Sequence, residues 1–362
     1  MRLTGQWGIT FAGLALLAVA GEAQVAPSRT TPDASVEKLI DQLVDFGASL
    51  ASGDPAAWRS QFLAIDDGPS LEEGHNPVDP VMRNLIRLGV RAVPALVRHL
   101  SDRRETKFIE NHSDGGVAMW FTDEYDPRFG DPQRQPKNVN TPIEVLSRSS
   151  LVPNMTYTFK VGDLCYLAIG QIVNRELVVT DYEPTAQEYI NSPIHSPTLA
   201  QAVAKDWGDL TPEAHRRQLE QDANRNWPAA GADAVKRLLY YYPKDGERVA
   251  LKLLNRRADA FFDEQVLVDS LQSFPNKRID AAVQGLFKWS IRQTSSDDFR
   301  RTYLDNLVEA CASRMKGKGF DRAYLAYFQR RVGEVESTPP SPPERSGLNV
   351  LKAWVRRFGG DE

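Results

Sequence analysis

Apolar residues recur every three or four positions along most of the chain, which is the period of an amphipathic helix. Three Xaa-Pro pairs predict helix starts, because Asp and Thr are good N-caps and proline at the first helical position loses no intrahelical bond. These pairs are Asp54-Pro55, Asp79-Pro80 and Thr211-Pro212. A first helix is predicted from an apolar face that runs from Val36 to Leu50. Only two short strand candidates stand out, around 155–159 and 177–180, so the pattern predicts an all-α fold.

The second half of the chain repeats one helical pattern three times. Each unit has two apolar-faced helices joined by a short turn, and the units begin near residues 228, 263 and 297. The turns fall at 243–246, 274–276 and 316–319, so successive units are offset by roughly 34 residues. A fixed period of helical hairpins is typical of an α-solenoid, in which each hairpin buries its apolar face against its neighbours. An irregular helical bundle with short loops is the alternative.

Two segments carry a more specific motif. The segment Leu88–Asp102 reads LGVRAVPALVRHLSD, and the segment Val161–Ile172 reads VGDLCYLAIGQI. Together they resemble the two helices of a HEAT repeat, an armadillo-type unit, and the match extends over about 85–102 and 161–175. Gly162 departs from the pattern, since the family usually has Arg there. The resemblance implies a HEAT-like α-solenoid over 33–333, with a long irregular insertion at 103–160 inside one repeat.

The insertion is the least repeat-like part of the chain and is rich in proline and aromatic residues. Insertions into solenoid repeats map to loops on one face, which is often the binding face. Four aromatic residues are therefore candidate binding residues, because aromatic faces offer a large contact area at low entropic cost. They are Trp120, Phe121, Tyr125 and Phe129. The same side chains are equally suited to anchor the insertion onto the helices. A second irregular stretch, 180–197, is expected to lie near the insertion.

Acidic residues and one histidine in the insertion give a second hypothesis, an enzyme. His112, Asp114, Asp123 and Asp126 are candidate metal ligands or acid/base groups of a metal-assisted hydrolase. Their spacing does not match a calcium-binding EF-hand loop, and acidic residues in proline-rich loops are usually turn formers. The chain contains no recognisable metalloprotease, hydrolase or nucleotide-binding motif. We therefore predict no metal and no cofactor, and favour a binding role over catalysis.

Two histidines outside the insertion have structural interpretations. His99 closes the HEAT-like helix, where a cation suits the helix dipole. His215 follows Glu213 and precedes two arginines, which predicts a solvent-exposed helical face.

The N-terminus has the features of a secretory signal peptide. Arg2 precedes an apolar run from Ile9 to Ala20, and small residues follow at suitable cleavage positions, so we assign residues 1–23 to the signal and 24–32 to a spacer. A membrane anchor is the alternative, but the run is short against the roughly 20 residues that cross a bilayer. The sequence thus predicts an exported protein, periplasmic or extracellular, with no later membrane span.

The C-terminal tail changes character twice. Residues 334–347 are rich in proline and predict a semi-rigid linker. Residues 348–362 form an amphipathic helix with Leu351, Trp354 and Phe358 on one face. This helix either caps the open end of the solenoid or docks onto a partner's groove or an anionic membrane.

Composition narrows the choice of partner. The chain has 362 residues and a formal net charge of −4, without a dense basic stripe, which argues against nucleic acid as the partner. Its two cysteines are too few for a disulfide scaffold or a four-cysteine zinc site. Cys165 and Cys311 both lie on apolar helical faces and are predicted to be core residues, although export would permit a bridge between them. The sequence predicts an interaction or scaffolding module whose partner is another protein.

Overall fold

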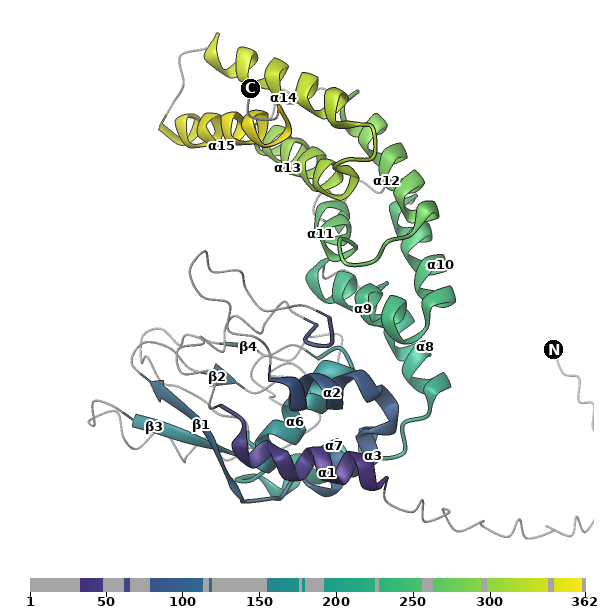
Figure 1. Ribbon diagram of the computed structural model, residues 1–362, viewed down its shortest axis with the longest axis vertical. Helices are drawn as coiled ribbons and strands as arrows, with labels where there is room; N and C mark the ends of the chain where they lie inside the picture. Colours follow the sequence, from purple (N-terminus) through teal and green to yellow (C-terminus); the bar gives the residue numbers. More distant parts are fainter. Residues whose placement is uncertain are drawn as a thin grey trace, which may run out of the picture. The chain divides into compact units, whose positions relative to one another are not determined.

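The computed structural model describes residues 33–47, 62–65, 79–112, 117–118, 155–175, 178–179, 192–224, 228–255, 263–293, 298–337 and 342–359 (Figure 1). All of these belong to one compact unit, Asp33–Glu362. The predicted signal peptide, the spacer and the helix start at Asp54 lie outside the described residues.

Helices make up most of the described residues, so the prediction of a mainly helical protein is confirmed. The helices are α1 (Ala34–Gln42), η1 (Leu43–Asp45), α2 (Pro80–Leu88), η3 (Gly89–Arg91), α3 (Val93–Arg98), α6 (Val161–Ile172), α7 (Pro197–Trp207), α8 (Pro212–Asp222), α9 (Pro228–Tyr241), α10 (Pro243–Leu254), α11 (Asp263–Ser270), α12 (Lys277–Ser290), α13 (Asp298–Met315), α14 (Asp321–Glu336) and α15 (Pro342–Gly359). The strands are β1 (Glu105–His112), β2 (Val117–Ala118), β3 (Met155–Lys160) and β4 (Val178–Val179).

The predicted caps begin their helices as expected. Asp79 accepts hydrogen bonds from the backbone N–H groups of Val81 (2.7 Å) and Met82 (3.3 Å) at the start of α2. The Thr211 hydroxyl accepts one from the N–H of Ala214 (3.2 Å) at the start of α8. In both helices proline occupies the first position, where an N–H would lack an intrahelical partner.

Helix α6 lies at the centre of the first core. Every one of its residues is buried, which agrees with a sequence that is apolar all round rather than on one stripe. It packs against α2 and α3, so the two segments with the HEAT-like motif are in contact. Cys165 is part of this core, and Cys311 is part of a second core formed by the C-terminal helices. Both thiols are free and buried, as predicted for core residues.

The three predicted hairpins have the expected helices, namely α9 with α10, α11 with α12, and α13 with α14. Figure 1 shows these helices following one another in chain order. Helix α9 packs against α10 and α11, α10 against α12, and α11 against α13. Each hairpin therefore contacts the one that follows it.

The C-terminal helix packs on the last hairpin. Leu351 and Phe358 are buried, and the Phe358 ring stacks on Phe328 of α14 with ring centroids 5.7 Å apart. The apolar face of α15 is thus occupied by the chain itself. The helices also extend into the predicted linker, because α14 continues to Glu336 and α15 begins at Pro342.

The insertion was predicted to be wholly irregular, but the structure places strands at its two ends. Its two ends, β1 and β3, pair as antiparallel strands, with His112 opposite Met155. The strand prediction near 155–159 is confirmed, whereas β1 was not predicted. Along β1, Thr106 and Phe108 are buried and Lys107 is exposed, but this alternation contains too few strongly apolar residues to stand out in the sequence. The fold is therefore mostly helical with few short strands, which is consistent with the predicted all-α class.

Candidate functional site

A row of four ion pairs fastens the N-terminal helix to the segment that leads into the insertion. The acidic residues are spaced four apart along α1 and η1, so they share one face of the helix. Their partners come from η3, from α3, from the residue just before β1 and from β1 itself. The pairs are Asp33–Arg91 (2.9 Å), Glu37–Arg98 (2.6 Å), Asp41–Arg104 (2.8 Å) and Asp45–Lys107 (2.6 Å). We call this row the α1 ion ladder.

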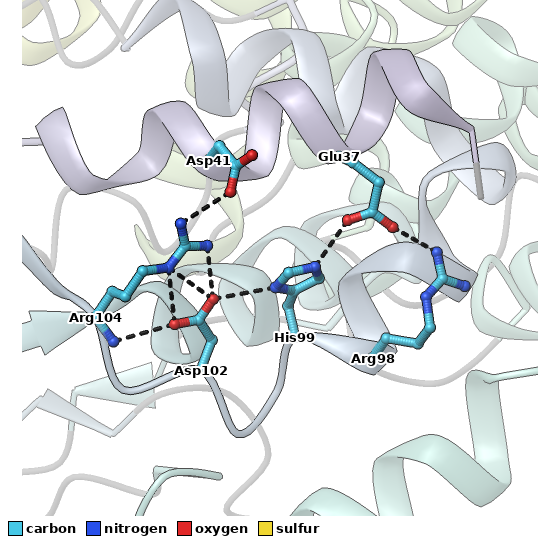
Figure 2. Close-up of polar contacts among 6 residues, drawn as sticks. All are labelled: Glu37, Asp41, Arg98, His99, Asp102 and Arg104. Carbon is cyan, nitrogen blue, oxygen red and sulfur yellow. Dashed lines mark hydrogen bonds and ion pairs between the residues drawn. The ribbon is translucent and has the colours of Figure 1, made fainter.

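His99 joins the two middle rungs of the ladder (Figure 2). It is the C-cap residue of α3, as the sequence predicted. Its Nε2 atom lies 2.8 Å from a carboxylate oxygen of Glu37, and its Nδ1 atom lies 3.1 Å from one of Asp102. Asp102 in turn accepts hydrogen bonds from the Arg104 guanidinium. The imidazole is therefore clamped between carboxylates from α1 and from the turn after α3.

This geometry is suited to holding α1 against α3 and the following turn rather than to catalysis. Carboxylates only accept hydrogen bonds, and a neutral imidazole has one donor and one acceptor. Each ring nitrogen of His99 lies within hydrogen-bond distance of a carboxylate. In a catalytic Asp-His pair, one ring nitrogen faces the substrate or the nucleophile. Here both nitrogens are occupied, so the cluster leaves no free base for a substrate.

The electrostatics of the carboxylates agree with this role. Burial alone would raise the pKa of Asp102, but hydrogen bonds from Arg104 and His99 outweigh it and lower the pKa to about 2. Burial likewise opposes the lowering of the Glu37 pKa, which is caused by hydrogen bonds from Arg98 and His99. The charged form of both carboxylates is therefore favoured.

The ladder ends at the root of the insertion. The backbone N–H of Gly162, at the start of α6, donates to the carbonyl of Asp102 (3.0 Å), and that of Val161 donates to the carbonyl of Arg104 (2.9 Å). A Cβ atom on Gly162 would lie 2.5 Å from the Leu100 carbonyl oxygen. The arginine usual in HEAT repeats would not fit here, which explains the departure of this chain from the motif.

A buried carboxylate at the same end of α6 holds the second irregular stretch. Asp163 accepts a hydrogen bond from the backbone N–H of Lys160 (2.9 Å) and one from the Ser192 hydroxyl (2.6 Å). Close by, the Arg103 guanidinium donates to the carbonyl of Ile194 (3.3 Å). Asp163 thus caps the helix and positions the residues just before α7.

The insertion also pairs with the segment just before the second irregular stretch. Strand β2, inside the insertion, pairs with β4, which directly precedes the 180–197 stretch. The described segments on either side of residues 180–191 therefore contact the insertion or the residues from which it begins. The partners are distant in the sequence, so no local pattern could show these pairings.

Most of the predicted site residues lie outside the described residues. These are Asp114, Trp120, Phe121, Asp123, Tyr125, Asp126 and Phe129. His112 ends β1, and its backbone pairs with Met155. Within the described ranges, no group of three or more His, Cys, Asp or Glu side chains is placed to hold a metal ion.

His215 corrects one prediction, because it is fully buried rather than solvent-exposed. Its Nε2 atom lies 2.9 Å from the Ile172 carbonyl oxygen, and its Nδ1 atom lies 3.0 Å from the Tyr242 hydroxyl. Burial lowers its pKa to about 4, so the ring is neutral at neutral pH. The charged neighbours of His215 in the sequence led to the prediction of an exposed face. Leu219 lies four residues later on the same helical face, and this spacing was the available sign that His215 is buried.

His215 belongs to a set of donors that caps the C-terminal end of α6. The Arg237 guanidinium of α9 donates to the Gln171 carbonyl (2.6 Å), and the Gln218 amide of α8 donates to the Val173 carbonyl (3.2 Å). Arg175 forms a buried ion pair with Asp222 of α8 (2.8 Å). Donors and cations at this end satisfy the last carbonyls and suit the helix dipole. The first core is thereby joined to the C-terminal helices.

Two further findings bear on partners and family. Among the helices described, none combines the length and the apolar character that a membrane span requires. Comparison of the chain with protein-family models, with curated proteins and with solved structures found no match. The resemblance to HEAT repeats therefore rests on the motif residues alone.

Proposed function

We propose that this chain is an exported HEAT-like α-solenoid repeat protein that acts as a protein-interaction or scaffolding module. Its recognition surface is built from the 103–160 insertion, helped by the 180–197 stretch, and its partner is another protein. The predicted signal peptide at residues 1–23 supports export.

The contacts between hairpins support the solenoid arrangement. In a solenoid each unit packs on its neighbours through corresponding helices. The first helices of the three hairpins, α9, α11 and α13, pack in that order, and the second helices α10 and α12 pack on each other.

A second row of ion pairs supports the same arrangement. Near each turn, a cation reaches a carboxylate on the preceding unit. The pairs are Arg248–Glu220 (2.8 Å), Arg278–Glu247 and Lys318–Asp280 (2.7 Å). We call this row the turn-edge ladder. Its recurrence once per hairpin is expected of a repeated unit.

The observation that carries the functional proposal is the shared anchoring of the two irregular stretches. Their roots are held at one end of α6 by Asp163, by Arg103 and by the α1 ion ladder, and β2 pairs with β4. Binding residues are concentrated on loops that a rigid scaffold positions. A completely buried helix with two polar anchors provides such a scaffold.

Replacing residues 113–154 tests this proposal. His112 and Met155 are direct cross-strand partners, so an Asn-Gly turn between them gives a β-hairpin of favoured geometry. The exported protein, with and without this replacement, is cross-linked to its partners in the native cell envelope. Each form is then purified, and the proteins that co-purify with it are identified. We expect the replacement to abolish capture of a specific partner, and binding of that purified partner to fall by more than tenfold.

A finer variant separates binding from folding. Replacing Trp120 and Phe121 with alanine is expected to weaken binding of the same partner without changing the thermal unfolding of the chain. If the shortened protein still unfolds cooperatively and retains every partner, the insertion is not the recognition element and the proposal is wrong.

A further inference from the structure

The turn-edge ladder leaves one cation per hairpin unpaired. The carboxylates of this ladder are paired with Arg248, Arg278 and Lys318. A second cation at each turn is exposed. Within the part of the chain that the structure describes, these second cations have no carboxylate within ion-pair distance. They are Lys244, Lys277 and Lys316, which we call the lysine strip.

The ladder brings the strip onto one edge. Arg278 and Lys277 are adjacent in sequence, and Arg278 reaches back to Glu247, three residues after Lys244. Lys318 reaches back to Asp280, three residues after Lys277. The three turns are thus neighbours, and the strip repeats once per hairpin.

Two lysines of the lysine strip are not explained by the stability of the helices. Lys244 and Lys277 lie in the first turns of α10 and α12, where the helix dipole disfavours a positive charge. Exposed side chains at these positions bury no core surface. Positions that break a local rule without a structural gain are candidates for function.

We propose that the lysine strip binds an extended acidic segment of a protein partner, with one carboxylate opposite each lysine. This inference rests on the proposed interaction function and adds the chemistry of a partner. Packed helices are about 10 Å apart, and one turn of a polyproline II helix covers three residues and about 9 Å. An acidic residue at every third position of such a segment would therefore present its carboxylates on one face at the spacing of the hairpins.

The surroundings of the strip favour separate carboxylates over a continuous polyanion. Asp245, Glu247 and Asp280 lie among the lysines and interrupt the positive potential. A membrane surface or a nucleic acid would bring phosphates against these carboxylates. A peptide with acidic residues at intervals would avoid them.

The test uses a labelled peptide of five Asp-Pro-Pro repeats, with an Asn-Pro-Pro peptide as the uncharged control. Binding to the chain without its predicted signal peptide is measured by fluorescence anisotropy at low salt. We expect Lys244→Gln/Lys277→Gln/Lys316→Gln to weaken binding about tenfold, in line with three exposed ion pairs. The matched control is Lys205→Gln/Lys252→Gln/Lys288→Gln, which removes three other exposed lysines and is expected to change binding less than twofold.

Three results would overturn the inference. They are absence of binding to the aspartate peptide, equal loss in both triple variants, and strip-dependent binding of phosphatidylglycerol vesicles or single-stranded DNA in place of the peptide. The protein with residues 113–154 replaced is expected to bind the peptide like the full chain. Failure of the insertion as a recognition element and failure of the lysine strip can therefore be told apart.

Discussion

At the scale of single residues, Gly162 illustrates how a departure from a motif reports a close backbone contact. The side chain usual in HEAT repeats is excluded because the Leu100 carbonyl occupies its space. Glycine here permits α6 to approach the turn that begins the insertion. This position is therefore sensitive to the smallest added side chain.

A pair of glycine substitutions checks this contact. Gly162→Ala is expected to lower the free energy of unfolding by about 2 kcal/mol or more, because the new Cβ atom meets the Leu100 backbone as well as the Ile194 side chain. Gly285→Ala in α12 is the matched control, since a Cβ atom there meets nothing within 4 Å. The control is expected to stabilise by about 1 kcal/mol through helix propensity. Urea unfolding of both variants provides the measurement, and equal effects of the same sign would contradict the contact.

His215 predicts how stability depends on pH. Its pKa in the folded protein is about 4, below the ordinary value of 6.5, so the unfolded chain binds the proton first. The contribution of His215 to stability is therefore complete above pH 6.5 and falls as pH drops from 6.5 towards 4, by about 3 kcal/mol at most. Urea unfolding at several pH values measures this loss.

A variant without the His215 imidazole isolates this effect. His215→Gln retains a donor for the Ile172 carbonyl but does not titrate, so between pH 6.5 and 4 it is expected to lack the loss of stability that His215 causes. Burial raises the pKa of Asp269 to about 6, so protonation of this carboxyl favours the folded state over the same pH range, equally in wild type and variant. Asp33 and Asp102 both have a pKa lowered to about 2, so they become protonated in the folded protein only at lower pH. Wild type and variant should lose stability equally there. The same slope for both proteins between pH 6.5 and 4 would show that His215 is not buried in the neutral form.

At the scale of elements, some features were predictable and others depended on distant partners. The hairpin helices were predictable because their apolar faces recur over three or four turns. The α1 ion ladder was not predictable, because the partners of its acidic residues lie about 60 residues further along the chain. The even spacing of the four acidic residues shows only that they share one face of the helix. Strand β1 was missed because its alternation is short and mostly polar.

A double-mutant cycle tests one rung of the α1 ion ladder. Glu37→Gln and Arg98→Gln, singly and together, are expected to give a coupling energy of about 0.5 kcal/mol that shrinks at high salt. Asp33 and Arg91 form the control pair, because Arg91 is 69% exposed and their coupling should be smaller. Thermal or urea unfolding at two salt concentrations supplies the values. Zero coupling for the inner rung at low salt would mean that the ladder does not fasten α1.

The candidate site shows the limits of sequence reasoning most clearly. His99 was correctly placed at a helix end, but its carboxylate partners come from α1 and from the following turn. The aromatic and acidic residues proposed for binding or catalysis lie mostly outside the described residues, so they remain predictions. What the structure adds is the anchoring of their segment, which depends on pairings such as Asp163 with Ser192 that no local pattern reveals.

At the scale of the whole molecule, each helical hairpin of the C-terminal part packs against the next one along the chain. The described residues contain two apolar cores, one around α6 and one in the C-terminal helices. Donors from α8 and α9 join them at the end of α6, and the Tyr241 hydroxyl donates to the Ile86 carbonyl of α2 (2.5 Å). Stability in such an assembly is expected to be graded along the chain, because each unit is supported by its neighbours.

Hydrogen exchange after removal of the last helix tests this claim most directly. Ending the chain at Ser337 removes α15 and exposes Phe328 on α14. We predict that amide exchange becomes fastest in α14 and α13, changes less in α11 and α9, and is unchanged in α6. Equal acceleration in every helix, α6 included, would show one cooperative core and contradict the stacked-hairpin account.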